Sequence, residues 1–480
     1  MPLPDLASFR APPADLIARF ASIVGREHAL TDPDMQLPYL REWRDAWVGR
    51  SALVLRPGSV DEVSKILALA NDTRTAVVPQ GGNTGLVGGQ IPFESGAEVV
   101  VSMSRLKRVR SVDAAGYALT VEAGMTLAEV QAAAAAAGRL FPLSLPSEGT
   151  CQLGGNLSTN AGGVGALAYG VARSLVLGLE VVLADGRVWN GLKALKKDNT
   201  GYDLKDLFIG AEGTLGIITA AVLRLFPKPA ERATAFVALD RIEKALDLFA
   251  LAQDAAGRGL TAFEFIPAGM MAMIVRNIPG ARAPFATPYP WTVLIELSGF
   301  KADGASQVLL ESALGEASEK GLIEDAVIAA SLGQARDFWR LREAVSEAQK
   351  PEGGNYKHDI SVPVHRIPEF IARANAAVEK ICPGCRPLAQ GHFGDGNVHY
   401  NVLQPAAMAR GEYGRYREDI VAAVHGIATD MDGSISAEHG IGRMKRGELA
   451  KVKSPLDLEL MRNIKAVFDP NGIMNPGKVL

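Results

Sequence analysis

The sequence predicts an α+β protein of several domains. Up to about residue 226, short apolar strands alternate with helices, two of which open on capping boxes, at Ser59–Glu62 and Thr126–Glu129. Beyond a proline-containing break at residues 227–231, longer segments indicate a sheet covered by helices on one face. The 480 residues include 50 glycines, and 23 of them lie between Pro79 and Ile217. Such a concentration indicates backbone that turns at positive φ or approaches a ligand closely.

The elements are expected in the following order. An amphipathic helix covers residues 15–24, and the two capped helices cover 59–70 and 126–137. The strands expected before the break are 51–56, 76–78, 99–103, 118–123, 180–184, 187–190 and 216–226, with a hairpin turn at Asp185-Gly186. The strands expected after it are 234–239, 261–266, 292–297, 326–329 and 359–362. The helices expected after it are 241–256, 306–320, 334–349 and 364–381, and the chain is mostly helical from about Met408.

The composition argues against several classes of protein. A net charge of −3 provides no electrostatic basis for binding nucleic acid. Three cysteines cannot build a disulfide framework, which favours a reducing compartment. The first ten residues do not fit a secretory signal, and no run approaches the roughly 18 apolar residues of a membrane span. We therefore expect a cytoplasmic protein, or one of the mitochondrial matrix if the source is a eukaryote.

Three glycine-rich segments account for the excess of glycine. They are residues 79–86, residues 146–163 and residues 210–217. Successive backbone N–H groups in such loops can surround an anion, and the Asn, Thr and Ser residues among them add donors suited to phosphate oxygens. Neither the Gly-x-Gly-x-x-Gly pattern of a Rossmann site nor a P-loop is present. The residues alone leave two interpretations open: three tight turns, or one phosphate-containing cofactor held by three loops.

The three segments together resemble those of a known cofactor-binding fold. Residues 79–86 resemble the pyrophosphate loop of the vanillyl-alcohol-oxidase-type FAD-binding fold, and residues 154–163 and 212–217 resemble its second and third flavin segments. Over residues 51–480 the chain resembles the FAD-dependent D-2-hydroxyacid dehydrogenases. The resemblance implies a two-lobed FAD-binding domain, an α+β cap domain with an antiparallel sheet, and a C-terminal helical segment that returns to the flavin.

This resemblance implies domains and flavin contacts. The expected domains are an N-terminal helical segment (1–48), the FAD-binding domain (49–228), the substrate-binding cap (229–425) and the C-terminal segment (426–480). FAD is expected to be non-covalent, because no histidine lies between His28 and His358. The residues expected to bind FAD are Pro79, Gln80, Gly81, Gly82, Asn83, Thr84, Gly85, Leu86, Pro146, Ser147, Gly149, Thr150, Gly154, Gly155, Asn156, Thr159, Asn160, Ala161, Gly163, Glu212, Gly213, Gly216, Ile217, Ile218 and Asn475.

Six of the seven histidines lie after residue 357. His392 and His399 occur in a glycine-flanked segment that is expected to form turns, and Glu438 precedes His439 in a second one. Two imidazoles and a carboxylate suit a divalent metal with a position open to substrate. The residues alone leave open that these are hydrogen-bonding loop histidines. The resemblance implies that His392, His399 and Glu438 bind a divalent metal, with zinc expected, and that His439 is the catalytic base.

A further set of polar residues concerns the substrate. Arg342 and Ser346 are four residues apart in an expected helix, hence on one face, and Lys357 follows a turn. Taken alone they fit solvated surface residues. The resemblance implies that Arg342, Ser346 and Lys357 recognise a carboxylate and that Asn401 contacts the substrate. An ammonium beside a guanidinium suits a second, distal carboxylate. We therefore expect a small dicarboxylic D-2-hydroxy acid, 2-hydroxyglutarate ahead of malate, to be oxidised to the 2-oxo acid with hydride transfer to N5 of FAD.

Several alternatives stay open. The first is a D-lactate or glycolate dehydrogenase, the second a non-catalytic flavin-binding subunit of an oxidase complex, and the third a zinc hydrolase without flavin. Neither an iron–sulfur cysteine pattern nor a second dinucleotide motif occurs in the sequence. The electrons are therefore expected to pass to an external acceptor, an electron-transfer flavoprotein or a quinone. A homodimer is left open.

Overall fold

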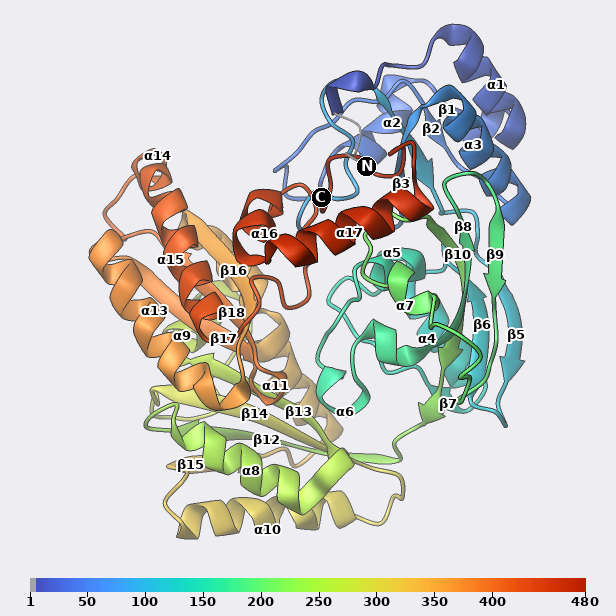
Figure 1. Cartoon of the computed structure of the whole chain (residues 1–480). Helices are drawn as coiled ribbons and strands as arrows, with labels where there is room; N and C mark the ends of the chain where they lie inside the picture. The colour runs from blue at the N-terminus through green and yellow to red at the C-terminus, as the bar shows by residue number, and fades with distance from the viewer. Residues whose placement is uncertain (1–5) are drawn as a thin grey trace. The chain divides into compact units, whose positions relative to one another are not determined.

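The computed structural model describes residues 6–480 and divides them into two compact units (Figure 1). Unit 1 contains the described residues up to Gly163, together with Gly170–Lys228 and Glu438–Leu480. Unit 2 contains Val164–Tyr169 and Pro229–Ala437. Each unit combines helices with β-sheet, in agreement with the predicted α+β class. The described residues of the predicted segment 1–48 lie in unit 1, and the chain returns to unit 1 after Ala437, whereas the predicted last segment begins at residue 426.

Unit 1 has two lobes, each built on its own sheet. The four-stranded sheet has the order β1 (Ala29–Leu30), β2 (Val54–Leu55), β4 (Glu98–Ser102) and β3 (Ala76–Gln80). The antiparallel five-stranded sheet has the order β5 (Val109–Asp113), β6 (Ala118–Glu122), β10 (Ile217–Arg224), β8 (Val176–Val182) and β9 (Val188–Gly191). A two-stranded pair joins β7 (Arg139–Leu140) to β11 (Phe226–Pro227). The predicted hairpin at Asp185-Gly186 connects β8 to β9.

Three helices of unit 1 begin within one residue of their predicted starts, at residues 14, 60 and 127, whereas the helices at 33–40, 153–158 and 205–208 were not predicted. The helices of unit 1 are α1 (Ala14–Val24), α2 (Pro33–Leu40), α3 (Val60–Thr73), α4 (Leu127–Ala136), α5 (Leu153–Ser158), α7 (Lys205–Phe208), α16 (Arg446–Val452) and α17 (Pro455–Phe468). Both halves of the capping box form at Thr126 and Glu129. At α3 only Ser59 takes its predicted part, because the carboxylate of Glu62 accepts from Gly58 N instead. The apolar faces of α1 and α3 pack with β2, β3 and β4 in one core.

Unit 2 is built on one antiparallel sheet of seven strands. Their order is β15 (Asp325–Ile328), β12 (Glu231–Leu239), β14 (Trp291–Gly299), β13 (Leu260–Pro267), β17 (Arg386–His392), β18 (Asn397–Leu403) and β16 (Asn355–Ser361). The helices are α6 (Ala166–Tyr169), α8 (Lys244–Ala256), α9 (Ala268–Asn277), α10 (Ala305–Glu319), α11 (Leu332–Glu343), α12 (Val345–Ala348), α13 (Ile367–Ile381), α14 (Arg410–Tyr413) and α15 (Arg417–Asp430).

The prediction that helices cover one face of this sheet is wrong. Helices α8, α10, α13 and α15 pack on one face, through a core that includes Phe263 and Ile295. Helices α9, α11 and α12 pack on the other, around Phe236 and Leu294. Neighbouring residues of a strand point to opposite faces, so the unbroken burial of residues 260–266 already requires cover on both sides. Among the described residues, no helix has the length and apolar character needed to cross a bilayer.

Two further differences concern the predicted site. The segment 391–401, expected to form turns, instead contains the end of β17, a short 3-10 turn at Phe393–Asp395 and most of β18. His392 and His399 are therefore strand residues. The predicted helix 334–349 is divided at Ala344 into α11 and α12, so that Arg342 and Ser346 belong to different helices. Arg342 is buried and Ser346 is exposed.

Candidate functional site

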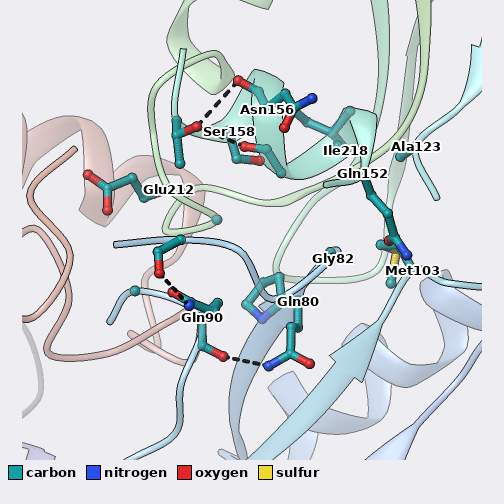
Figure 2. Close-up of a pocket in the computed structure, with 18 of the residues that line it drawn as sticks. Gln80, Gly82, Gln90, Met103, Ala123, Gln152, Asn156, Ser158, Glu212 and Ile218 are labelled. Carbon is teal, nitrogen blue, oxygen red and sulfur yellow. Dashed lines mark hydrogen bonds between the residues drawn. The ribbon is translucent and has the colours of Figure 1, made fainter. Parts of the chain in front are cut away.

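The three glycine-rich segments of unit 1 line one cavity (Figure 2). The cavity has a volume of about 130 Å³. The predicted flavin residues that line it are Pro79, Gln80, Gly81, Gly82, Asn83, Thr84, Gly85, Gly154, Gly155, Asn156, Thr159, Glu212, Gly213, Gly216, Ile217, Ile218 and Asn475. His439, the predicted base, lines the same cavity.

Eight residues predicted to bind FAD are not among those that line this cavity. They are Leu86, Pro146, Ser147, Gly149, Thr150, Asn160, Ala161 and Gly163. Several of them shape the loops instead. The carbonyl of Leu86 accepts a hydrogen bond from Arg44, and Oδ1 of Asn160 accepts from Arg173 N at 2.9 Å. Residues that line the cavity without having been predicted include Gln90, Met103, Ala123, Gln152 and Ser158.

Three amide side chains at the cavity share one pattern of hydrogen bonds, in which the NH2 group donates to carbonyl oxygens of the protein. Nε2 of Gln80 donates to Tyr39 O and Gln90 O, and Nδ2 of Asn83 donates to Pro38 O and Arg41 O. Nδ2 of Asn475 donates to Gly89 O at 3.0 Å and Glu212 O at 2.8 Å. The side-chain oxygen of each amide is buried without a hydrogen-bond partner in the described part of the chain. A buried acceptor in this state is costly unless a ligand donates to it.

These orphaned oxygens test whether the cavity suits FAD. The flavin, ribityl and adenine groups of FAD all carry N–H or O–H donors, so three buried acceptors fit this cofactor. The result also revises the predicted role of Asn83: its side-chain N–H groups bind the protein, and therefore do not serve as donors to phosphate. Backbone N–H groups of the loops can still serve as donors to an anion.

Close backbone approach explains glycine at one edge of the cavity. A Cβ at Gly82 would lie 2.0 Å from the carbonyl oxygen of Thr150, so the first and second glycine loops could not meet with any other residue there. At Gly155 a Cβ would meet nothing within 4 Å and would project into open space beside the loops. Glycine thus brings two segments together at one point and leaves room for a ligand at the other.

The C-terminal segment completes the cavity from the side of β3. Val77 N donates to Ile473 O and Asn475 N donates to Val77 O, both at 2.8 Å, so residues 473–475 pair with β3 just before the first glycine loop. Nζ of the buried Lys465 donates to Thr214 O at 2.6 Å and to Met474 O at 2.7 Å. These hydrogen bonds hold Asn475 beside the third glycine loop.

In unit 2, four of the predicted metal and substrate residues share one face of the sheet, namely His392, His399, Lys357 and Asn401. Residues that pair directly across two strands point to the same side. The registered pairs are Glu264 with His392, Gln390 with His399, Asp359 with His399, and Lys357 with Asn401. The residues between them, among which are Ala389, Val398 and Tyr400, belong to the core on the opposite face. Strand alternation therefore gathers these polar side chains, and β17, β18 and β16 lie side by side in Figure 1.

Glu264 connects two of the predicted residues. Its Oε1 lies 2.7 Å from Nδ1 of His392, and its Oε2 accepts a 2.7 Å hydrogen bond from Nε of Arg342 on α11. Glu264 is 1% exposed. Burial raises the pKa of its carboxyl, but the charges of His392 and Arg342 outweigh that effect and bring the pKa to about 2. The side chain is therefore a carboxylate at neutral pH.

His399 has a carboxylate neighbour of its own. Nδ1 of His399 lies 3.7 Å from Oδ1 of Asp359, and Nδ2 of Asn397 donates to the same oxygen at 3.0 Å. The rings of His392 and His399 have their centroids 5.5 Å apart. A carboxylate at Nδ1 of an imidazole is the arrangement that orients metal-binding histidines in proteins. The donor chemistry of this pair therefore suits a divalent metal.

The last segment of unit 1 carries Glu438 and His439. Nε2 of His439 lies 3.6 Å from Oε1 of Glu438. A Cβ at Gly162 would lie 3.1 Å from Oε2 of Glu438, so this carboxylate lies beside the second glycine loop. The segment is bound directly after the first glycine loop, where Arg443 N and Met444 N both donate to Val87 O.

The sequence patterns did not single out three of these polar residues. Glu264 and Gln390 are 1% and 3% exposed, and Asp359 is also buried. The available signal for Glu264 is a single carboxylate in the apolar strand Leu260–Pro267, which is costly unless it is paired. Pairing it with His392 requires the register of β13 against β17, which the sequence does not display.

Comparison with known proteins identifies the family. The FAD-binding domain model matches residues 51–191, and the model of the C-terminal domain of FAD-linked oxidases matches residues 228–479. A D-2-hydroxyglutarate dehydrogenase of Arabidopsis thaliana, named mitochondrial, is 38% identical over 465 residues, which cover 97% of this chain and 81% of the relative. One of Xanthomonas citri pv. viticola is 37% identical over 449 residues, 94% of this chain and 93% of the relative. A D-2-hydroxyglutarate–pyruvate transhydrogenase of Saccharomyces cerevisiae is 35% identical over 483 residues, 98% and 96% respectively.

Solved structures with the same fold are more distant in sequence. p-Cresol methylhydroxylase with bound substrate is 16% identical with a TM-score of 0.75, over 97% of this chain and 96% of that one. An alkyldihydroxyacetonephosphate synthase is 16% identical with a TM-score of 0.72, over 99% and 89%. They agree with the predicted vanillyl-alcohol-oxidase-type fold. With the two family models and the curated relatives, this shows that the chain is an FAD-dependent oxidoreductase that belongs to the FAD-linked oxidases, among the D-2-hydroxyacid dehydrogenases.

Proposed function

We propose that this protein oxidises D-2-hydroxyglutarate to the 2-oxo acid with non-covalent FAD and a divalent metal, zinc ahead of others. The observation that carries the proposal is the presence of His439 among the residues that line the glycine-loop cavity. A base at the cofactor cavity suits dehydrogenation, in which the hydroxyl proton and a hydride leave the same substrate. The names of the relatives support the choice of substrate.

Each proposed group has its own role in the reaction. When bound, FAD supplies the two-electron oxidant and the metal supplies a Lewis acid at the substrate hydroxyl. His439 accepts the hydroxyl proton, because an imidazole is the side chain that most often serves as a general base. His392, His399 and Glu438 are the proposed metal ligands. The two histidines have carboxylate neighbours, and Glu438 follows Ala437, whose N–H donates to Asp359 O at 3.2 Å.

Arg342, Lys357, Ser346 and Asn401 are the proposed substrate contacts. Nε of Arg342 is committed to Glu264, and this is the only hydrogen bond of the Arg342 side chain in the described part of the chain. Its two Nη groups are therefore available to a carboxylate, for which the guanidinium fork is suited. Lys357 is exposed and stands opposite Asn401 in the sheet. We propose that Lys357 binds the distal carboxylate that D-lactate and glycolate lack.

The substrate proposal is tested by comparing two lysine variants. Dye-reduction rates of the wild type, Lys357→Ala and Lys350→Ala are measured with D-2-hydroxyglutarate, D-malate, D-lactate and glycolate. Lys357→Ala is expected to lower kcat/KM for D-2-hydroxyglutarate by about 10- to 100-fold and leave D-lactate nearly unchanged, because a hydrogen bond to a charged group contributes about 1.5–3 kcal/mol. Lys350, exposed in the same unit, is the control. An unchanged ratio of the two substrates would refute the distal-carboxylate role.

The metal proposal has a separate test. Metal is removed with chelator, its residual content is measured by elemental analysis, and turnover is followed as zinc or manganese is restored. We expect loss of turnover while FAD stays bound, and recovery with added metal. Full turnover by metal-free protein that retains FAD would refute the metal role and favour a dehydrogenase that relies on His439 alone.

The electron acceptor is proposed to be external, an electron-transfer flavoprotein or a quinone, in the cytoplasm or mitochondrial matrix. Because one relative is named a transhydrogenase with pyruvate, pyruvate is included as a third acceptor. Single-turnover reduction of the enzyme, followed by mixing with each acceptor, identifies the one that reoxidises the flavin. Reoxidation by pyruvate alone would contradict the proposed acceptor.

A further inference from the structure

The carboxylate of Glu212 binds the segment that carries His439. Its Oε1 accepts a 2.7 Å hydrogen bond from Ile441 N, and its Oε2 accepts one of 2.8 Å from Gly442 N. All of these residues belong to unit 1. In Figure 2 the Glu212 carboxylate is directed away from the other labelled residues of the cavity. Glu212 was expected to bind flavin, but its side chain is committed to this neighbouring segment.

The backbone of Glu212 is held on the cavity side at the same time. Its N–H donates to Ser158 O at 2.8 Å, and its carbonyl accepts from Nδ2 of Asn475 at 2.8 Å. Ser158 ends α5 in the second glycine loop, and Asn475 lies in the C-terminal segment. The residue itself has a φ of 52°, a left-handed conformation that is rare outside glycine. Backbone and side chain together therefore join the walls of the cavity to the segment at 439–442.

The segment at 439–442 has little conformational freedom at its contact with Glu212. Gly440 has a φ of +82°, and a Cβ there would lie 2.8 Å from Oε1 of Glu212. Gly442 has a φ of +51°, and a Cβ there would lie 2.4 Å from Val87 O. The backbone can reach the carboxylate only because both residues are glycine. Two hydrogen bonds to consecutive N–H groups, next to His439, then define the course of the chain at that histidine.

We propose that Glu212 is a positioning residue for His439, and that it couples the conformation of the flavin-binding loops to the position of the base. The inference rests on the proposed role of His439. A carboxylate suits this task because it offers two acceptor oxygens to two neighbouring N–H donors. Loops that close on the cofactor then also align the base.

The test uses Glu212→Gln in the FAD-loaded protein, alone and combined with His439→Ala. The amide keeps one acceptor oxygen and turns an NH2 group toward the other backbone N–H, so one of the two hydrogen bonds is lost. Alone, the variant is expected to lower kcat by about 100-fold and to change KM little. A loss of this size is expected when a catalytic group, here His439, is displaced by about 1 Å. In the His439→Ala background it should cost less than about 3-fold, because residues that act as a unit are not additive.

Amide hydrogen exchange provides a readout that is independent of turnover. Glu212→Gln should accelerate exchange at Ile441 and Gly442 while FAD stays bound. Glu129→Gln is the matched control, because it removes a carboxylate that accepts a backbone N–H at the start of α4, away from this segment. If Glu212→Gln does not fold, Glu212→Asp retains the charge but is one methylene too short to reach both donors, and should give the same pattern.

The outcomes separate this inference from the proposed function. An equal loss of kcat from Glu212→Gln in both backgrounds, or unchanged exchange at Ile441 and Gly442, overturns the positioning role. Wild-type turnover by His439→Ala overturns the proposed base, and with it the purpose assigned to Glu212. A loss of turnover in His439→Ala, together with the expected non-additivity, supports both.

Discussion

Oε1 of Glu264 lies 2.7 Å from Nδ1 of His392, and the two residues are direct partners in the register of β13 and β17. The other oxygen of the same carboxylate accepts from Arg342. One buried acidic side chain therefore orients a proposed metal ligand and a proposed substrate contact together. This arrangement leads to the first two predictions.

Replacing Glu264 by glutamine should weaken metal binding. The change removes a charge and one strong acceptor from the pair with His392, and loss of a group that orients a metal-binding histidine typically costs about 10- to 100-fold in affinity. Metal content is measured by elemental analysis after dialysis against graded chelator. Glu296→Gln is the control, since Glu296 is a buried carboxylate on neighbouring β14 that accepts from Nε1 of Trp339 at 2.7 Å. Equal metal retention by Glu264→Gln and the wild type would contradict the prediction.

Replacing Arg342 by methionine should destabilise unit 2. Removing one partner of a buried ion pair lowers the free energy of unfolding by about 3–5 kcal/mol, because the remaining charge is buried without its partner. Here His392 stays beside Glu264, so we expect the lower end of that range. Urea denaturation measures the loss. The double variant Arg342→Met with Glu264→Gln should be more stable than Arg342→Met alone, and a less stable double variant would show that the unpaired carboxylate is not the cause.

The acid stability of unit 2 should depend on Glu352. Burial opposes its ionisation, but hydrogen bonds from Arg386, Asn277 and Arg276 outweigh burial and lower its pKa to about 2. Between the ordinary carboxyl pKa and 2, the unfolded chain binds the extra proton, so the contribution to stability is present near neutrality and is lost as pH falls from about 5 toward 2. The urea midpoint of Glu352→Gln should therefore fall less steeply with acid than that of the wild type. Glu347→Gln, an exposed carboxyl on α12, should follow the wild-type slope.

Replacing Lys465 by methionine should loosen the C-terminal segment and weaken FAD binding. The ammonium pairs with the buried Asp469 and donates to Thr214 O and Met474 O. Its loss leaves two carbonyls without that donor and a buried carboxylate without a counter-charge. The free energy of unfolding should therefore fall by about 3–5 kcal/mol. Thermal unfolding and FAD retention on gel filtration measure the effect. Lys451→Met, an exposed lysine on α16, is the control, and full FAD retention by Lys465→Met would refute the link to the cavity.

Local patterns predicted elements more reliably than the layers they build. The capping boxes, the Asp185-Gly186 hairpin and most strands rest on neighbouring residues, whose conformations depend on short-range sterics and hydrogen bonds. Helix 334–349 was predicted, but its place on the second face of the sheet is a long-range fact that local patterns do not contain, and the ten-residue α9 on the same face was not predicted. The glycines of the histidine segment predict turns, but the polar–apolar alternation of residues 397–403 gives the better account, since those residues form β18.

By itself, the sequence determined the cofactor class and the approximate positions of the three glycine-rich loops, because the segments that carry the resemblance are contiguous stretches of backbone. The tertiary structure alone decided what the individual side chains do. Asn83 uses its amide N–H groups within the protein, Glu212 holds the segment of His439, and Glu264 joins His392 to Arg342. Each of these contacts joins residues that are far apart in the chain, by 42, 229 and 128 positions in three of the hydrogen bonds. Burial and strand register, rather than local pattern, select such partners.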